Sequence, residues 1–483
     1  MILANPGWIE SIGAALFALA VLHTFSTRHF QHLAHTNPAH SGLWHLLGEV
    51  ETVFGFWAFL LLVFMAAAQG WTSASEYLDA QRFVEPMFVF VIMVIAASRP
   101  VMQVASDAVA LAARGLPFQR GLAVYFVSLS LVPLLGSFIT EPAAMTLAAL
   151  LLRDTIFSRG VSARLKYATL GVLFVNISIG GTLTNFAAPP VLMVAAKWEW
   201  STAHILAVMG WKAVLAVLIN SALLTLVFRQ ELAKRAAVAA RSGAPRVPAA
   251  LVAVNMAILA LVVASNHDPE VFMGLFLLFL GLAEAYARHH DRLILREGLM
   301  VAFFLAGLVV LGGQQRWWLE GVLSNLDGST LFFGAAALTA ITDNAALTYL
   351  GSLVEGVSEE FKYALVAGAV AGGGLTVIAN APNPAGFAIL KDSFDEQSIN
   401  PFGLFVAALP PTLVAIGCLW GLRGVRPEIA EAFDLQRWSA WFSELDRSFL
   451  FLLILPFVVA AVGLWAELSR PRGQEGSSRG DKG

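Results

Sequence analysis

The 483-residue sequence has one cysteine, Cys418, and few charged residues. A single cysteine excludes an internal disulfide and argues against a metal site built from thiolates. Charged side chains make up 13% of the chain, where a soluble domain has about 25%. The net charge of −3 comes without a basic stripe, so nucleic acid is not expected as a partner. With 58% hydrophobic residues and a mean hydropathy of +0.72, the composition indicates a polytopic membrane protein.

Other signatures are missing as well. Residues 1–7 contain no Lys or Arg, so the first apolar segment is expected to be a retained helix rather than a cleaved signal. The metalloprotease motif His-Glu-x-x-His does not occur. We therefore expect neither enzymatic activity nor a cofactor.

Long apolar segments dominate the chain. About eleven of them approach the roughly 20 residues that a spanning helix needs, and they lie near 7–27, 43–69, 84–105, 166–196, 205–228, 249–266, 270–288, 297–313, 362–391, 402–422 and 447–467. Two further stretches, 121–152 and 330–354, are interrupted by Thr140-Glu141-Pro142 and Thr342-Asp343-Asn344. We interpret these two as re-entrant hairpins, with the polar break at the tip buried in protein or facing a wet cavity.

The sequence around the first break returns around the second. Residues 139–146 (ITEPAAMT) resemble residues 341–348 (ITDNAALT), and each copy is followed by Lys-Tyr-Ala, at 166–168 and 362–364. In both copies an apolar stretch broken by Gly and Pro comes next. Three elements in the same order indicate an internal duplication. Because an odd number of predicted spans separates the copies, the second is expected to be inverted, as in many secondary transporters.

This interpretation predicts an all-α protein with inverted repeats, two broken helices and six regions. They are N-terminal transmembrane helices (1–80), a first repeat (81–228), a cytoplasmic linker with connecting transmembrane helices (229–296), a second repeat (297–422), an interfacial segment with a C-terminal helix (423–469) and a disordered cytoplasmic tail (470–483). Lys and Arg are in excess in the loops opposite the N-terminus, so the positive-inside rule places the N-terminus outside and the C-terminus in the cytoplasm. The expected location is the bacterial inner membrane.

Each repeat places one acid, Glu141 or Asp343, inside apolar sequence, where ionised groups are costly and usually functional. Thr and Asn oxygens and the carbonyls of a broken helix are hard ligands suited to a small cation. A carboxyl group removed from water favours its neutral form, so it can carry a proton or a cation but not comfortably both. Competition of this kind is the minimum machinery for exchanging Na⁺ against H⁺. The alternative, compatible with it, is that each acid caps a half-helix.

The predicted ion- and proton-binding residues are the polar residues at the hairpin tips and helix breaks. They are Thr140, Glu141, Thr184, Asn185, Thr342, Asp343, Asn344, Thr376 and Asn380, with Asn383 as a weaker candidate; the Na⁺ ligands proposed among them are Asp343, Glu141, Asn185 and Asn380. For the Thr and Asn residues the alternative is hydrogen bonding to the broken backbone. Three further acids, Glu49, Glu51 and Glu284, either line a proton path, pair with neighbours or reach the membrane surface.

Two basic features have simpler interpretations. Lys212, near the start of an apolar segment, is expected to extend to the membrane surface. Six of the ten histidines fall between His23 and His45, and the spacing His29-x-x-His32-x-x-His35 makes a metal site conceivable. We expect instead a solvated, partly protonated cytoplasmic loop, with pH sensing as the alternative.

At the hairpin tips and helix breaks, the sequence resembles the ion transporter superfamily. Thr342-Asp343-Asn344 followed by Gly372-Gly373-Gly374 is similar to the second-half signature of NhaD-type sodium/proton antiporters, and Asn176 to Gly180-Gly181 with Asn185 is similar to the first-half one. The overall likeness, over about residues 80–425, is to a bacterial family described as putative sodium/proton antiporters. It implies inverted repeats with two re-entrant hairpins and two broken helices, and it suggests a homodimer.

The hairpin tips depart from some relatives of this superfamily. The Ser-Asn-Thr tip motif of its dicarboxylate transporters is absent, and Pro142 stands where Asn would be expected, so Asp343 matches better than Glu141. The leading hypothesis is Na⁺(Li⁺)/H⁺ antiport by alternating access at these two acids, with Na⁺, H⁺ and membrane lipid as partners. The alternative is an anion transporter, for arsenite or a carboxylate. Two tip acids, and no arginine nearer than Arg99, count against it.

Overall fold

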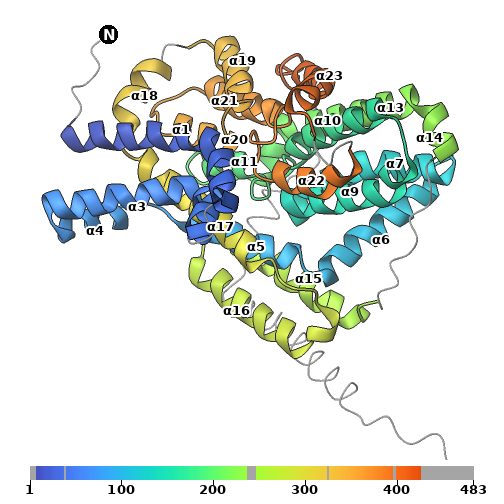
Figure 1. Ribbon diagram of the computed structural model, residues 1–483, viewed down its shortest axis with the longest axis horizontal. Helices are drawn as coiled ribbons and strands as arrows, with labels where there is room; N and C mark the ends of the chain where they lie inside the picture. The colour runs from blue at the N-terminus through green and yellow to red at the C-terminus, as the bar shows by residue number, and fades with distance from the viewer. Residues whose placement is uncertain (1–6, 37–39, 236–245, 324–325, 395–398, 426–483) are drawn as a thin grey trace, which may run out of the picture.

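The computed structural model describes residues 7–36, 40–235, 246–323, 326–394 and 399–425, and within these ranges it contains helices and no strand (Figure 1). The prediction of an all-helical protein is confirmed. In the described part, 5 helical stretches are long and apolar enough to cross a membrane, or up to 7 if each of two bent pairs counts as one span. The number of about eleven spanning segments stays a prediction. The proposed span 447–467, most of the interfacial segment and the tail 470–483 lie outside the described residues.

The N-terminal region consists of α1 (Trp8–Thr36), α2 (Ser41–Leu47), α3 (Val50–Gln69) and α4 (Trp71–Asp79). Helices α1 and α3 pack together at one end of the molecule (Figure 1). The predicted single segment 43–69 is wrong, because Gly48 and Glu49 separate α2 from α3. The first histidines of the cluster lie on α1 and not in a loop. That helix continues beyond its apolar part because neither glycine nor proline occurs between Gly13 and Pro38.

The first repeat contains α5 (Val84–Ala96), α6 (Arg99–Gly115), α7 (Arg120–Leu129), α8 (Leu131–Ile139), α9 (Glu141–Thr155), η2 (Phe157–Arg159), α10 (Ala163–Gly180), α11 (Pro189–Ala195), α12 (Thr202–Ile205), the π-helix η3 (Leu206–Gly210) and α13 (Trp211–Val227), and α14 (Arg229–Arg235) begins the predicted linker. The chain breaks at Thr140 and after Gly180, as predicted. The expected single helix 84–105 is wrong, since the axis bends by 66° between α5 and α6. Pro100 explains this bend: it cannot continue α5, but it is well accommodated in the first turn of α6.

Helices α15 (Ala249–Ala264), α16 (Pro269–Ala285) and η4 (Ala287–His289) lead to the second repeat, which contains α17 (Leu295–Gly312), α18 (Arg316–Leu323), α19 (Gly328–Thr339), α20 (Asn344–Ser352), α21 (Glu359–Gly372), α22 (Asn383–Leu390), η5 (Lys391–Ser393) and α23 (Pro401–Leu419). Asp327 caps α19 through the amides of Ser329 and Thr330. A hydrogen bond from the Thr330 hydroxyl holds the pKa of this exposed carboxyl below its usual range. The breaks after α19 and α21 fall where the sequence predicts them.

The two copies share local structure beyond the repeated letters. Ser162 caps α10 and Ser358 caps α21, each four residues before the Lys of Lys-Tyr-Ala. The second half of each broken helix packs on the hairpin of the other copy: α11 contacts α20, and α22 contacts α9. These short helices gather in the middle of the molecule (Figure 1). The two repeats are therefore interlocked there.

Candidate functional site

Glu141 is the more enclosed of the two predicted site acids. It begins α9, and 0% of its surface is exposed. Its Oε2 accepts a hydrogen bond of 2.8 Å from Nδ2 of Asn380, a residue 239 positions later in the chain. Within the described part, its Oε1 has no hydrogen-bond partner. The carboxyl of one repeat is thus held by the helix break of the other, and only one of its two oxygens has a hydrogen-bond partner in the described residues.

Further polar atoms around the two breaks are buried without a partner in the described residues. They are Thr140 Oγ1, Asn380 Oδ1, Asn383 Oδ1 and both polar side-chain atoms of Asn344. An unsatisfied buried polar group costs about 1–3 kcal/mol, so such groups are rarely left unpaired. Most of these atoms are oxygens, the ligand type that hard monovalent and divalent cations prefer. The arrangement fits an oxygen-coordinated cation or a proton shared among these groups.

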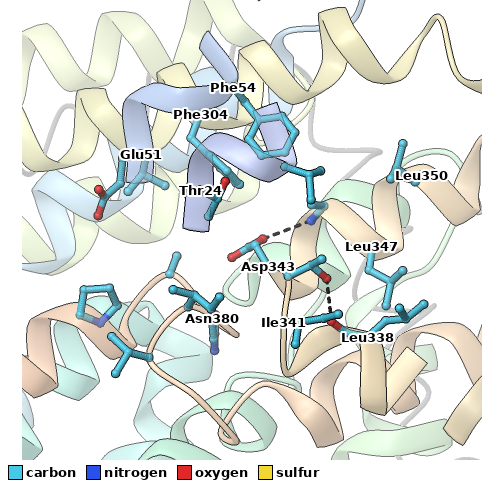
Figure 2. A pocket seen from close by; sticks show the side chains of 18 of the residues that line it. Thr24, Glu51, Phe54, Phe304, Leu338, Ile341, Asp343, Leu347, Leu350 and Asn380 are labelled. Carbon is cyan, nitrogen blue, oxygen red and sulfur yellow. Dashed lines mark hydrogen bonds between the residues drawn. The ribbon is translucent and has the colours of Figure 1, made fainter. Parts of the chain in front are cut away.

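Asp343 caps a helix and also faces a cavity. It caps α20, because its Oδ1 accepts hydrogen bonds of 2.8 and 3.1 Å from the amides of Ala345 and Ala346. The side chain is only partly buried, and it faces a cavity of about 140 Å³ that Asn380 also lines (Figure 2). When both are ionised, the negative charges of Asp343 and Glu141 repel each other. A cation or proton between them would relieve that repulsion.

Two of the repeated glycines allow this close packing. A Cβ atom on Gly181 would overlap the Oε1 atom of Glu141, and one on Gly373 would lie 2.8 Å from Nδ2 of Asn344. Side chains at these positions would push the polar groups of both hairpin tips out of place. The glycine pairs in the two broken stretches therefore make room for the site as well as ending helices.

The backbone is strained immediately before Glu141. Thr140 has φ 69° and ψ 151°, a region that is almost reserved for glycine and is unusual for a β-branched residue. Such strain costs on the order of 1–3 kcal/mol and tends to occur at functional sites. It turns the chain sharply at the hairpin tip, so that Glu141 starts the next helix facing inward.

The predicted threonines bond mainly to the backbone. Thr184 Oγ1 donates to the carbonyl of Ser137 at 2.7 Å, and Thr376 Oγ1 donates to that of Ala340 at 2.8 Å. These contacts join each helix break to the hairpin of its own repeat. Thr342 Oγ1 likewise donates to the carbonyl of Leu338 in α19, at 2.9 Å. Each of the three threonines thus has the backbone bond proposed as the alternative to direct ligation.

Asn185 lies in a different environment. Its Nδ2 donates to the carbonyl of Trp200 at 2.9 Å, and its Oδ1 accepts from the Thr202 hydroxyl at 2.7 Å. It lines a second, smaller cavity of about 20 Å³ together with Glu85 and His267. The structure therefore gives Asn185 partners of its own, apart from the Glu141–Asn380 pair.

The three acids outside the repeated motif occupy three different settings. Glu51 lines the same cavity as Asp343. Glu49 forms an ion pair of 2.5 Å with Arg296. Glu284 is exposed and lines neither of the two cavities described here.

The expectation for Lys212 is wrong. Its side chain is 1% exposed, its Nζ donates to the Tyr363 hydroxyl at 3.1 Å, and it lies 4.7 Å from the centre of that ring. The Tyr363 hydroxyl donates in turn to the carbonyl of Leu419. Contact with an aromatic ring and a hydroxyl partly replaces hydration of the ammonium group. Lys212 thereby joins α13, α21 and α23 instead of reaching the surface.

The solvated-loop interpretation is also wrong for His23. This residue is buried on α1, where its Nδ1 accepts from the indole of Trp57 at 3.1 Å and its Nε2 lies 2.9 Å from the carbonyl of Leu47. His29 and His32 are exposed on the same helix. Across the described residues, no group of three His, Cys, Asp or Glu side chains is placed to hold a metal ion.

A buried network beside the site was not predicted. Asn176 Nδ2 donates to the carbonyl of Leu129 at 2.8 Å, where α7 bends into α8, and its Oδ1 accepts from Asn220 at 3.0 Å. Asn220 also donates to the carbonyl of Pro411 in α23 at 3.2 Å. The network satisfies the carbonyl of Leu129, which has no helical donor because Pro133 follows four residues later. An asparagine inside an apolar segment, as at position 220, was the available signal.

The comparison with known families agrees with this geometry. A family described as "Putative Na+/H+ antiporter" matches residues 8–422. The chain belongs to this family. The match begins at the first helix, so it includes the N-terminal region that the motifs alone left undiagnosed. None of the curated proteins matches the chain. Family membership and the apolar helices make this a multi-pass membrane transporter, from a family whose transported ions are Na⁺ and H⁺.

Proposed function

We propose that this protein exchanges cytoplasmic Na⁺ or Li⁺ for external H⁺ by alternating access, with cation and proton competing at Glu141 and Asp343. The observation that carries the proposal is the state of Glu141. Its carboxyl is fully buried and has one hydrogen-bond donor, amid oxygen atoms that lack partners in the described part. An ionised carboxyl in that position needs a cation, and a neutral one needs a proton.

Compensation of the carboxylate charge couples the movement of Na⁺ to that of H⁺. A carboxylate with bound Na⁺ and a protonated carboxyl are both nearly neutral, whereas an empty carboxylate is a buried charge that is costly to move through an apolar region. The site therefore changes the side it faces when it carries either ion and stays in place when it is empty. Exchange of one ion for the other follows from this rule.

The positions of the two Lys-Tyr-Ala copies support an inverted arrangement of the repeats. The Tyr167 hydroxyl accepts from the amide of Asn400, which caps the start of α23. The Tyr363 hydroxyl donates to Leu419, the last residue of the same helix. A helix of 19 residues is about 28 Å long, close to the apolar thickness of a bilayer. We propose that the copies face opposite sides, with the N-terminus outside, in a bacterial inner membrane.

The wall of the larger cavity favours a cation over an anion. The residues that line it in the described structure include two carboxyl groups, Glu51 and Asp343, and neither Lys nor Arg. Arsenite or a carboxylate would need donors or positive charge at this place. The anion alternative therefore has less support than antiport.

The proposal is tested in inside-out vesicles with an imposed proton gradient. Adding NaCl or LiCl should collapse the pH difference in vesicles that contain the protein. Asp343→Asn and Glu141→Gln should each lower the exchange rate about tenfold or more, since each removes a charge-assisted interaction worth at least about 1.5 kcal/mol.

Glu270→Gln, which changes an exposed acid at the start of α16, is the control and should exchange normally. Absence of any response to Na⁺, Li⁺ and K⁺ over the whole working pH range, with the protein shown to be inserted, would contradict antiport. Normal exchange in Asp343→Asn would remove that residue from the mechanism.

A further inference from the structure

The larger cavity joins the site to helices outside the repeats. One side of it is formed by the second hairpin and the break after α21, which contribute Asp343 and Asn380. The other side is formed by α1, α3 and α17, and here Thr24 and Glu51 contribute the polar groups (Figure 2). The N-terminal helices α1 and α3 therefore form part of the cavity wall at the site, although they lie outside the duplicated sequence.

The wall is apolar apart from a few groups. Besides Thr24, Glu51, Asp343, Thr342 and Asn380, the lining side chains of the described structure are hydrocarbon, proline or aromatic. A volume of about 140 Å³ holds several water molecules. An acid that faces such a space among apolar side chains is costly unless it serves an ion.

A buried atom in the same wall independently points to a ligand. Asn380 is 1% exposed, and its Oδ1 has no hydrogen-bond partner in the described part, whereas its Nδ2 is committed to Glu141. An amide oxygen left free beside a cavity with two carboxyls provides an additional hard ligand for a small cation.

The charges that face Glu51 form an ordered series. Arg296 and Glu49 pair at 2.5 Å, with the arginine side chain 62% exposed. Glu51 interacts electrostatically with both of these groups and with Asp343, and Asp343 interacts with Glu141. Because Arg296 pairs with Glu49, Glu51 is the first acid of this series that lines the cavity, and it forms no ion pair in the described structure.

We infer that Glu51 is a third cation- and proton-accepting carboxyl, which passes Na⁺ and H⁺ between the surface near Arg296 and the deeper acids Asp343 and Glu141. This inference rests on the proposed antiport function. The competing explanation is that Glu51 only stabilises the N-terminus of α3 through its charge. In that case its removal would lower stability and leave the dependence on ions unchanged.

Transport kinetics separate the two explanations. In vesicles, Glu51→Gln should raise the Na⁺ concentration for half-maximal exchange about tenfold and alter its pH profile, since one ion-binding carboxyl is lost. Glu51→Asp should restore most of the activity, and Glu270→Gln should match the unsubstituted protein. A Glu51→Gln protein that is inserted and has unchanged Na⁺ and pH dependence would overturn the inference.

A chemical measurement keeps the test independent of transport. Dicyclohexylcarbodiimide modifies protonated carboxyls in apolar surroundings, and mass spectrometry would locate the adducts in the unsubstituted protein. NaCl, compared with choline chloride at equal ionic strength, should reduce the adduct at Glu51. An adduct that NaCl does not reduce, or no adduct at Glu51, would overturn the inference. If the vesicles show no exchange at all, the proposed function fails, and the labelling still decides whether Glu51 binds a cation.

Discussion

Thr140 shows how a single residue positions the candidate site. Its left-handed backbone turns the hairpin tip, and its hydroxyl is buried without a partner in the described structure. Glycine would adopt this conformation without strain, so the retention of threonine points to a use for the hydroxyl. The nearest acceptor or ion for that hydroxyl is expected beside Glu141.

Two substitutions separate the strain from the hydroxyl. Thr140→Gly removes both and should stabilise the protein by about 1 kcal/mol, because the relief of strain exceeds the entropy cost of glycine. Thr140→Ala removes the hydroxyl and keeps the strain, so it should not stabilise. Both should weaken Na⁺ dependence in the vesicle assay. Thermal unfolding in detergent measures the first effect, and equal stability of the two variants would contradict the strain argument.

At the scale of single residues, the sequence predicts which side chains belong to the candidate site better than it predicts where they lie in the fold. The cost of placing an ionised group inside apolar sequence was enough to select Glu141 and Asp343. The apolar residues that surround Glu51 in the sequence were enough to suggest that residue as well. Likeness to known motifs ranked Asp343 above Glu141, yet the structure encloses Glu141 more completely. Enclosure by Asn380 depends on a contact between distant parts of the chain, which no local pattern contains. The same reason explains why Lys212 was expected at the surface.

The broken helices place both halves of the site. Each ends at glycines whose missing side chains admit a polar group from a hairpin tip, as Gly181 admits Glu141. Adding a methyl group there forces the carboxylate to move, because the surrounding interior is close-packed.

Gly181→Ala should therefore destabilise the protein by about 1–3 kcal/mol and abolish exchange. Gly274→Ala on α16 is a matched control, because nothing lies within 4 Å of the added Cβ and the helix should gain about 0.5–1 kcal/mol. Thermal unfolding and vesicle exchange would be measured for both. Exchange at the normal rate in Gly181→Ala would show that the Glu141 carboxyl does not depend on this packing.

Element boundaries followed from the sequence wherever a breaker stood alone in an apolar segment. The breaks at the two hairpin tips and within the two broken helices were predicted from the polar residues, glycines and prolines there, whereas the bend of 41° between α7 and α8 was not. The bend at Pro100 was missed because average hydropathy carried the predicted segment across Ser98-Arg99-Pro100 to residue 105. The end of α1 was missed because polar residues continue that helix beyond its apolar part. Hydropathy marks the part of a helix that suits lipid, and the helix itself can be longer or shorter.

At the scale of the whole molecule, the inverted arrangement can be tested by accessibility. Cys418 is the only cysteine and is buried, so Cys418→Ala gives a background free of thiols. Ser158→Cys, before α10, should react with a membrane-impermeant maleimide from the cytoplasmic side only. Glu360→Cys, at the start of α21, should react from the external side only, because Lys-Tyr-Ala follows it at the other end of α23.

Both positions are exposed in the structure, and permeabilised cells would confirm that each thiol reacts when both sides are open. Labelling of the two positions from the same side would contradict the inversion. The interlocked packing of α11 on α20 and α22 on α9 would then need another explanation.

The hydrogen bond between Glu141 and Asn380 also bears on the ancestry of the gene. After a duplication, two copies can usually diverge separately, since each keeps a complete set of contacts. Here the acid of one copy is held by the amide of the other, so a substitution in either half changes the selection acting on its twin. The two halves can then change only together at this contact, although their hairpin tips differ, with Glu-Pro in one and Asp-Asn in the other.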